Sequence, residues 1–356
     1  MIIYVIIAIV FFGILVGIHE FGHFAVAKLC GIRVEEFAIG MGPAIFQKKK
    51  GETLYSLRCI PFGGYCAMTG EDGESEDPRA FVNQKVWKRF LVLVAGAFMN
   101  FLLGFIIVLC LFAGAEGYAV PSIVSFMDGC PYESAEGFQA GDWIMKIDGH
   151  RVYSTADVTA RLREDTPQTF LLMRNGEEVT LRDYSMKKIE YTDEEGNTGR
   201  YFGFRLGYEY DKPTFGNYLR YSWNETMGFV RMVWQSLGML LSGQAKVTDL
   251  SGPVGIVDLM AETGESAATA SDAAFNIAYL GAFIAVNLAV MNLLPIPALD
   301  GGRIFLLLIT WVIETLTRRK LNPKFEAYIH GAGMVLLLAL MAFVMLNDIV
   351  RIVKGG

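Results

Sequence analysis

The sequence predicts a polytopic α-helical membrane protein that carries a soluble α+β insertion in its middle. Of the 356 residues, 53% are hydrophobic and only 19% are charged, which is more apolar than an ordinary soluble domain. The surplus is concentrated in four stretches without a charged side chain, at residues 2–18, 90–115, 273–299 and 331–347. Between residues 117 and 207 the pattern changes to short β-type runs with few long apolar blocks.

Each uncharged stretch approaches or exceeds the ~17–25 residues that a helix needs to cross a bilayer, so we predict four transmembrane helices. The first stretch has no basic residue before it, and no small-residue cleavage site follows it. It therefore differs from a secretory signal, and we expect it to be retained as a helix.

The basic residues predict the orientation of these helices. Segment 28–89 carries ten Lys and Arg residues, and the short linker between the third and fourth helices carries Arg303, Arg318, Arg319, Lys320 and Lys324. By the positive-inside rule both segments are cytoplasmic. Both termini and the long segment 116–272 are then expected outside the cytoplasm.

Charge and cysteine content exclude two other classes of protein. The net charge is −6, and no basic cluster is interleaved with aromatic residues, so nucleic acid is not an expected partner. The five cysteines are odd in number and scattered over both predicted sides and a span, which indicates no disulfide framework.

The first predicted span ends in a metal-binding pattern, His-Glu-x-x-His. On a helix His19 and His23 share one face, so both imidazoles can reach a single zinc ion. Glu20 then flanks the open coordination position, where a carboxylate can move a proton during peptide hydrolysis. The alternative is a satisfied polar cluster between packed helices. Ionisable groups within a span are costly and more often mark a functional site.

A catalytic zinc generally has three protein ligands, and neither remaining histidine lies in a suitable motif. The third predicted span ends in a segment with two prolines, Pro295 and Pro297, followed by Asp300. The prolines are expected to break the helix near the boundary that His19 and His23 reach. The expected third ligand is therefore a carboxylate, and Asp300 can come within range of the metal.

Short β-type runs follow the first span and are separated by the charged turn 48–51. They predict a β-hairpin over residues 40–64, in which glycines such as Gly63 and Gly64 permit tight bends and close backbone approach. Its open edge could hold an unwound substrate segment as an added strand. An ordinary cytoplasmic loop is an equally good interpretation of these residues alone.

The central insertion resembles a bacterial PDZ domain, most clearly at residues 129–149. There a short helix is expected before the turn at Gly141 and Asp142, and a strand and a second turn at Asp148 and Gly149 follow. PDZ domains bind extended segments or C-termini by adding a strand to a sheet edge. An inert β-rich domain is the alternative. The predicted divisions are residues 1–115, the PDZ domain at 116–210, an amphipathic segment at 211–272, and the last two spans at 273–356.

Three features together resemble the site-2 protease family of intramembrane zinc metalloproteases: the His-Glu-x-x-His span, the PDZ insertion, and the pattern Asn-x-x-Pro-x-Pro-x-Leu-Asp-Gly at residues 292–301. The similarity is strongest to the bacterial branch that cleaves membrane-bound anti-sigma factors, and it extends to residues 61–65 and 251–253. The resemblance implies Zn²⁺ bound by His19, His23 and Asp300. It also implies that Asn292 holds the substrate backbone or the developing oxyanion, with Asn287 a weaker candidate.

The resemblance further implies that the hairpin is a re-entrant β-structure on the cytoplasmic side of a bacterial cell membrane. The PDZ domain is then extracytoplasmic, and the expected activity is regulated intramembrane proteolysis of single-pass membrane proteins already trimmed on their outer side. Anti-sigma factors and signal peptides are the expected substrate types. A catalytically silent PDZ-bearing scaffold with a structural metal is the main alternative. A transporter is less favoured, because the four spans show no internal repeat.

Overall fold

The computed structural model describes residues 2–71, 73–192, 198–244, 252–318 and 323–353. The chain forms two compact units. Unit 1 comprises residues 1–111 and 229–356, and unit 2 comprises residues 112–228. Three residues named above, Ser251, Arg319 and Lys320, lie outside the described part of the chain.

Four helices of unit 1 are long and apolar enough to cross a membrane, which confirms the four predicted spans. They are α1 (Ile2–Leu29), α2 (Val86–Phe112), α6 (Ala270–Asn292) and residues 331–348 of α8 (Pro323–Val353). The first helix continues well beyond residue 18 to Leu29, and no proline interrupts it before the turn at Gly31. Gly31 has φ +77°, and Ile32 N–H donates to the Ala27 carbonyl in the pattern of a Schellman cap. The metal-binding pattern consequently lies in the interior of a helix.

The third span is shorter than predicted, and the predicted short linker after it contains a helix. α6 ends at Asn292, and α7 (Asp300–Thr317) follows after a break of seven residues that includes both prolines. Ala298 within the break has φ +81°. Arg303 on the first turn of α7 forms an ion pair with Glu71, from the segment after the hairpin. The break redirects the chain so that Asp300 is the first residue of a new helix.

The predicted hairpin is present as β1 (Val34–Lys50) and β2 (Thr53–Met68), and its pairing is more elaborate than a simple hairpin. Residues 34–39 pair with 64–68 on one side and with 54–57 on the other, while residues 44–50 pair with 53–58. Each strand therefore bends and contributes two segments to one mixed sheet, in which the inner segments 36–39 and 54–57 run parallel and the outer segments pair antiparallel with them. The outer segments are 44–50 and 60–68. Gly40 and Gly42, both at positive φ, lie at the bend in β1.

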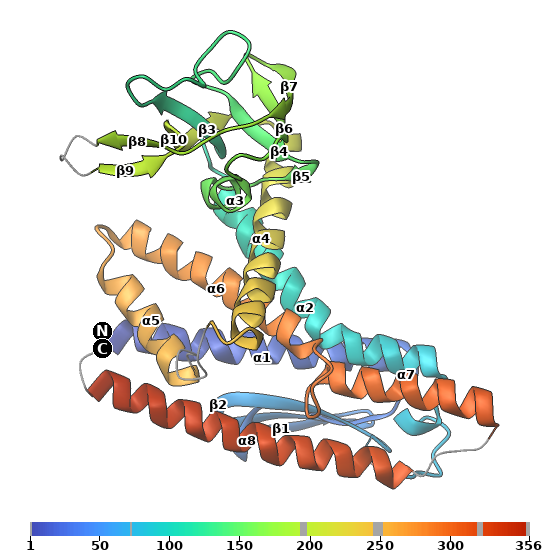
Figure 1. Ribbon diagram of the computed structural model, residues 1–356. Coiled ribbons are helices and arrows are strands. Elements are labelled where there is room, and N and C mark those ends of the chain that lie inside the picture. Colours follow the sequence, from blue (N-terminus) through green and yellow to red (C-terminus); the bar gives the residue numbers. More distant parts are fainter. Residues whose placement is uncertain (1, 72, 193–197, 245–251, 319–322, 354–356) are drawn as a thin grey trace. The chain divides into compact units, whose positions relative to one another are not determined.

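Two further helices and a short 3-10 turn complete unit 1. α5 (Pro253–Glu265) packs against α1, α6 and α8, and the turn η1 spans Phe81–Asn83. The C-terminal part of α4 (Phe215–Leu241) also belongs to this unit. Gly252 is the N-cap residue immediately before α5. Its N–H and the N–H of Gly255 each donate to the Asp348 carboxylate at 2.9 Å. A side chain of α8 therefore caps the first turn of α5. Figure 1 shows the elements of this unit by colour and label.

Unit 2 is built on a mostly antiparallel sheet with strand order β10-β3-β4-β6-β7, and β5 pairs with β4. Its elements are β3 (Tyr118–Phe126), β4 (Trp143–Ile147), β5 (His150–Arg151), α3 (Thr155–Arg161), β6 (Gln168–Arg174), β7 (Glu177–Tyr184), β8 (Ile189–Thr192), β9 (Thr198–Tyr201) and β10 (Phe204–Asp211). β8 and β9 form a separate hairpin. The N-terminal part of α4 belongs to this unit.

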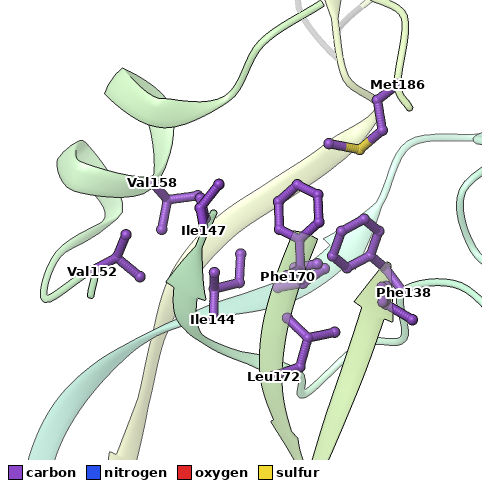
Figure 2. Packing of buried hydrophobic residues seen from close by; sticks show 10 residues of the cluster. Phe138, Ile144, Ile147, Val152, Val158, Phe170, Leu172 and Met186 are labelled. Carbon is purple, nitrogen blue, oxygen red and sulfur yellow. The ribbon is translucent and has the colours of Figure 1, made fainter. Parts of the chain in front are cut away.

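The core of unit 2 is an apolar cluster in which Phe138 and Phe170 meet edge to face, with ring centroids 5.1 Å apart (Figure 2). A turn at Asn175 and Gly176 joins β6 and β7, and both residues have positive φ as a tight hairpin requires. Asp142 is fully buried and accepts hydrogen bonds from Arg174 Nε and Nη2, each at 2.7 Å. This pair ties the turn before β4 to the end of β6.

Candidate metal centre

His19 and His23 lie one turn apart on α1, and their side chains converge. The two Nε2 atoms are 3.2 Å apart, and the ring planes are nearly perpendicular. Only 12% and 9% of these side chains are exposed. The pattern His-Glu-x-x-His therefore has the geometry that its spacing predicts for two ligands of one ion.

Asp300 meets the two histidines from α7. Its Oδ2 lies 3.1 Å from His19 Nε2 and 3.3 Å from His23 Nε2. Three atoms at the corners of a tetrahedron, each 2.0–2.1 Å from a zinc ion, would be roughly 3.3 Å apart, which matches this triangle. The Oδ2 atom is also buried without a hydrogen bond, which suits an atom whose partner is a metal ion. The three residues form a group of potential metal ligands.

Asp300 is held in place by the two glycines that follow it. A Cβ at Gly301 would lie 2.3 Å from the Leu293 carbonyl carbon, and one at Gly302 would lie 2.2 Å from the Ile296 carbonyl oxygen. The first turn of α7 therefore packs directly on the backbone of the proline-containing break. This close contact explains why the sequence Asp-Gly-Gly is needed at this position.

The orientation of His23 is fixed by α2. Its Nδ1 lies 2.8 Å from the carbonyl oxygen of Val92, in a buried position. A carbonyl can only accept a hydrogen bond, so Nδ1 carries the proton and Nε2 keeps its lone pair. The lone pair therefore points toward His19 and Asp300, as metal binding requires.

Two further residues of α2 face the histidines and were not predicted. A Cβ at Gly96 would lie 2.3 Å from His23 Nε2, so α2 approaches the site with bare backbone at this position. Asn100, one turn later, is 1% exposed, and its Nδ2 lies 3.4 Å from His19 Nδ1. An amide side chain inside an uncharged span was the sequence signal that could have identified Asn100.

Glu20 is adjacent to the ligand group but does not belong to it. A Cβ at Gly64 would lie 3.3 Å from Glu20 Cγ, so this glycine allows the edge of the sheet to approach Glu20. Burial, together with the Glu20 carboxylate, raises the pKa of the Cys66 thiol, which therefore stays protonated and is a poor metal ligand.

The remaining predicted site residues are placed at different distances from the metal group. Asn292 is the last residue of α6, and its Nδ2 lies 3.5 Å from His19 Nδ1. Asn287 is half-buried on α6 and makes no side-chain hydrogen bond with a described residue. Gly63 has φ +84°, and a Cβ there would meet the Met41 side chain at 2.6 Å. The structure thus brings Asn292 close to the predicted ligand His19 and Gly64 close to Glu20, whereas the atoms nearest to a Cβ at Gly63 belong to Met41 of β1.

Comparison with known proteins identifies the family. Residues 7–340 match the model of peptidase family M50. A predicted zinc metalloprotease of Clostridium perfringens is 37% identical over 353 residues, covering 98% of both chains. A second one, of Clostridium acetobutylicum, is 35% identical and covers 97% of both. The regulator of sigma-W protease RasP of Bacillus subtilis is 28% identical and likewise covers 97% of both. The chain therefore belongs to peptidase family M50, the site-2 proteases, and is a zinc-dependent intramembrane metalloprotease of the bacterial cell membrane.

Proposed function

We propose that the protein hydrolyses peptide bonds of single-pass membrane proteins within the bilayer, with zinc bound by His19, His23 and Asp300. The observation that carries this proposal is the triangle of ligand atoms, with edges of 3.1–3.3 Å. The alternative is a scaffold with a structural metal, which would close its fourth position with another protein ligand. Among the described residues, no fourth His, Cys, Asp or Glu joins the group. An open fourth position favours catalysis.

A zinc ion bound here would polarise the scissile carbonyl and lower the pKa of water at its open position. Glu20 neighbours the ligands without being one of them, so its carboxylate is free to take the proton from the attacking water. It can then deliver that proton to the nitrogen of the departing amine. Glu20 is therefore proposed as the general base and then the general acid.

Asn292 is the proposed group that holds the substrate backbone or the developing oxyanion. It is half-buried at the C-terminus of α6, beside the break that leads to Asp300. An amide N–H aimed at a carbonyl oxygen stabilises negative charge as that charge develops. Asn287 lies five residues earlier on α6 and is the weaker candidate for this substrate-binding role.

The sheet formed by β1 and β2 is proposed to be re-entrant. At one end Glu52 pairs with Lys28 and Arg79, each at 2.8 Å, near the C-terminus of α1. At the other end Gly64 lies next to Val16 of α1. Val16 precedes Lys28 by twelve residues, which is about 18 Å along the helix axis. Exposed apolar side chains gather toward this second end: Met41, Ile45, Phe46 and Ile60. A sheet with one charged and one apolar end suits insertion into a bilayer from its surface.

The outer segment of β2 is proposed to bind substrate. A membrane-spanning helix hides its amides in internal hydrogen bonds, so it must unwind locally before hydrolysis. Segment 60–68 is an edge of the sheet and lies beside Glu20. An unwound segment added here as a strand would present its amides next to the proposed base. Gly64 permits this closeness, and Gly63 supports the bend that shapes the edge.

Unit 2 is proposed to be an extracytoplasmic PDZ domain. The turns at Gly141–Asp142 and Asp148–Gly149 and the antiparallel sheet support this proposal. The prediction of a short helix before Gly141 is wrong, because residues 131–140 form turns and an isolated bridge, and the short helix α3 follows the second turn instead. The proposal also includes the four-part division of the chain given above and the location of both termini outside the cytoplasm. Prior trimming of the substrate on the outer side, and anti-sigma factors or signal peptides as substrates, are likewise proposed. The name of the Bacillus subtilis relative, regulator of sigma-W protease, supports anti-sigma factors as substrates.

The substitution Glu20→Gln tests this function. It should retain stoichiometric zinc, because Glu20 is not a proposed ligand, and it should lose nearly all hydrolysis of a membrane peptide. Zinc content and cleavage are measured on the purified, full-length protein. Membrane peptides that accumulate in cells carrying this variant would identify the substrate. Full activity of the purified variant would contradict the assigned role of Glu20.

A further inference from the structure

Asn100 is a buried amide inside an uncharged span, and the residues proposed for catalysis do not account for it. The residue is 1% exposed, and its buried Oδ1 has no hydrogen-bond partner among the residues that the structure describes. Its Nδ2 lies 3.4 Å from His19 Nδ1. A desolvated amide destabilises the fold unless its polar atoms are used. The position of Asn100 beside His19 indicates what it is used for.

Metal binding by His19 determines which of its ring nitrogens carries the proton. Its Nε2 faces His23 and Asp300, so this atom must offer a lone pair to the metal. A neutral imidazole then carries its proton on Nδ1, which requires a hydrogen-bond acceptor. The amide nitrogen of Asn100 cannot accept. Its oxygen can, and rotating the amide by half a turn exchanges the two atoms with almost no change of shape.

The arrangement of α2 favours Asn100 over Asn292 as this acceptor. Val92, Gly96 and Asn100 follow one another at intervals of four residues and so form a stripe on one face of the helix. The Val92 carbonyl already accepts from His23 Nδ1, and Gly96 lets the helix backbone lie directly against both rings. Asn100 stands in the same relation to His19 as Val92 does to His23. Asn292 is half-buried and slightly farther from His19, at 3.5 Å.

We infer that Asn100 is the positioning residue of His19. Its amide oxygen accepts the Nδ1–H bond and thereby directs the lone pair of Nε2 at the metal, leaving Asn292 available for substrate. This inference rests on the proposed ligand set. α2 then holds both histidines, one through a backbone carbonyl and the other through an amide side chain. Partners of this kind fix the orientation and basicity of metal-bound histidines.

The test compares three variants of the purified full-length protein. Asn100→Leu keeps the approximate volume and removes the acceptor, Asn100→Asp keeps an acceptor, and Asn292→Leu is the matched control that removes an amide on the other side of His19. Zinc affinity is measured by competition with a chelator. The visible absorption spectrum of the cobalt-substituted protein reports the ligand geometry.

We expect Asn100→Leu to bind zinc about 10–100-fold more weakly than the wild type and to change the cobalt spectrum. Asn100→Asp should restore both properties, and Asn292→Leu should leave both unchanged while lowering cleavage. A folded Asn100→Leu variant with wild-type affinity and spectrum would overturn the inference. So would a loss of zinc in Asn292→Leu alone.

Two further outcomes keep the test decisive. If Asn100→Leu does not fold, Asn100→Asp decides, since a folded Asp variant that has lost its zinc contradicts an acceptor role. If His19→Ala retains wild-type zinc affinity, the ligand set itself is wrong. That result is separate from failure at Asn100 and would overturn the inference together with the proposed ligands.

Discussion

Replacing Gly96 by alanine should weaken zinc binding strongly, with little effect on the rest of the fold. The added Cβ would lie 2.3 Å from His23 Nε2 and 2.8 Å from His19 Nε2, whereas ordinary contacts begin at 3.4 Å. Either α2 must shift, or the imidazole of His23 must move by about 1.1 Å and that of His19 by about 0.6 Å. Metal–ligand distances tolerate changes of only about 0.2 Å. The ligand atoms can then no longer keep their distances to a single zinc ion.

The expected loss of zinc affinity is on the order of 100-fold or more, the upper end of what indirect changes around a metal site produce. Overpacking should lower the free energy of unfolding by only about 1–3 kcal/mol. Zinc content of the purified variant and its thermal unfolding measure the two effects separately. Gly17→Ala is the matched control on α1, because nothing lies within 4 Å of its new Cβ. A Gly96→Ala protein with stoichiometric zinc and normal cleavage would refute the observed spacing of α1 and α2.

Three other predictions concern the third ligand, unit 2 and the orientation. Asp300→Ala should lose both zinc and cleavage, and stoichiometric tight zinc in this variant would show that another residue is the third ligand. Arg174→Met leaves the buried carboxylate of Asp142 without its cationic partner and should destabilise unit 2 by about 3–5 kcal/mol in thermal or denaturant unfolding. An unchanged transition would contradict that. A cysteine at Ser185 should react with an impermeant thiol reagent in intact cells, whereas one at Glu74 should not; the opposite pattern would reverse the orientation.

The sequence predicted those parts of the site that depend on local spacing. His19 and His23 share a face because a helix has 3.6 residues per turn, and the prolines before Asp300 predict the break that brings this residue to them. Gly96 and Asn100 could not be assigned in this way. Their role depends on which face of α2 packs against α1, and a uniformly apolar span carries no periodicity that identifies this face.

Two parts of the fold were also beyond the sequence pattern. The helix α7 lies where the sequence predicted a short linker, because its uncharged stretch, residues 304–313, is too short to span a bilayer. The hairpin was predicted, yet its double pairing was not. That pairing arises because both strands bend, and residues 34–39 then have neighbours on both sides. Short apolar runs with glycines specify a bend without specifying which segments meet across it.

The cap on α5 joins two parts of the chain that lie far apart in the sequence and are synthesised at different times. Asp348 accepts from the N–H groups of Gly252 and Gly255, which precede it by 96 and 93 residues. During synthesis α5 is therefore made long before the carboxylate that completes its first turn. Until the last helix has been inserted, those two amides need another acceptor, such as water. Formation of this contact would mark the completion of the membrane unit, and a chain that ends before Asp348 would lack it.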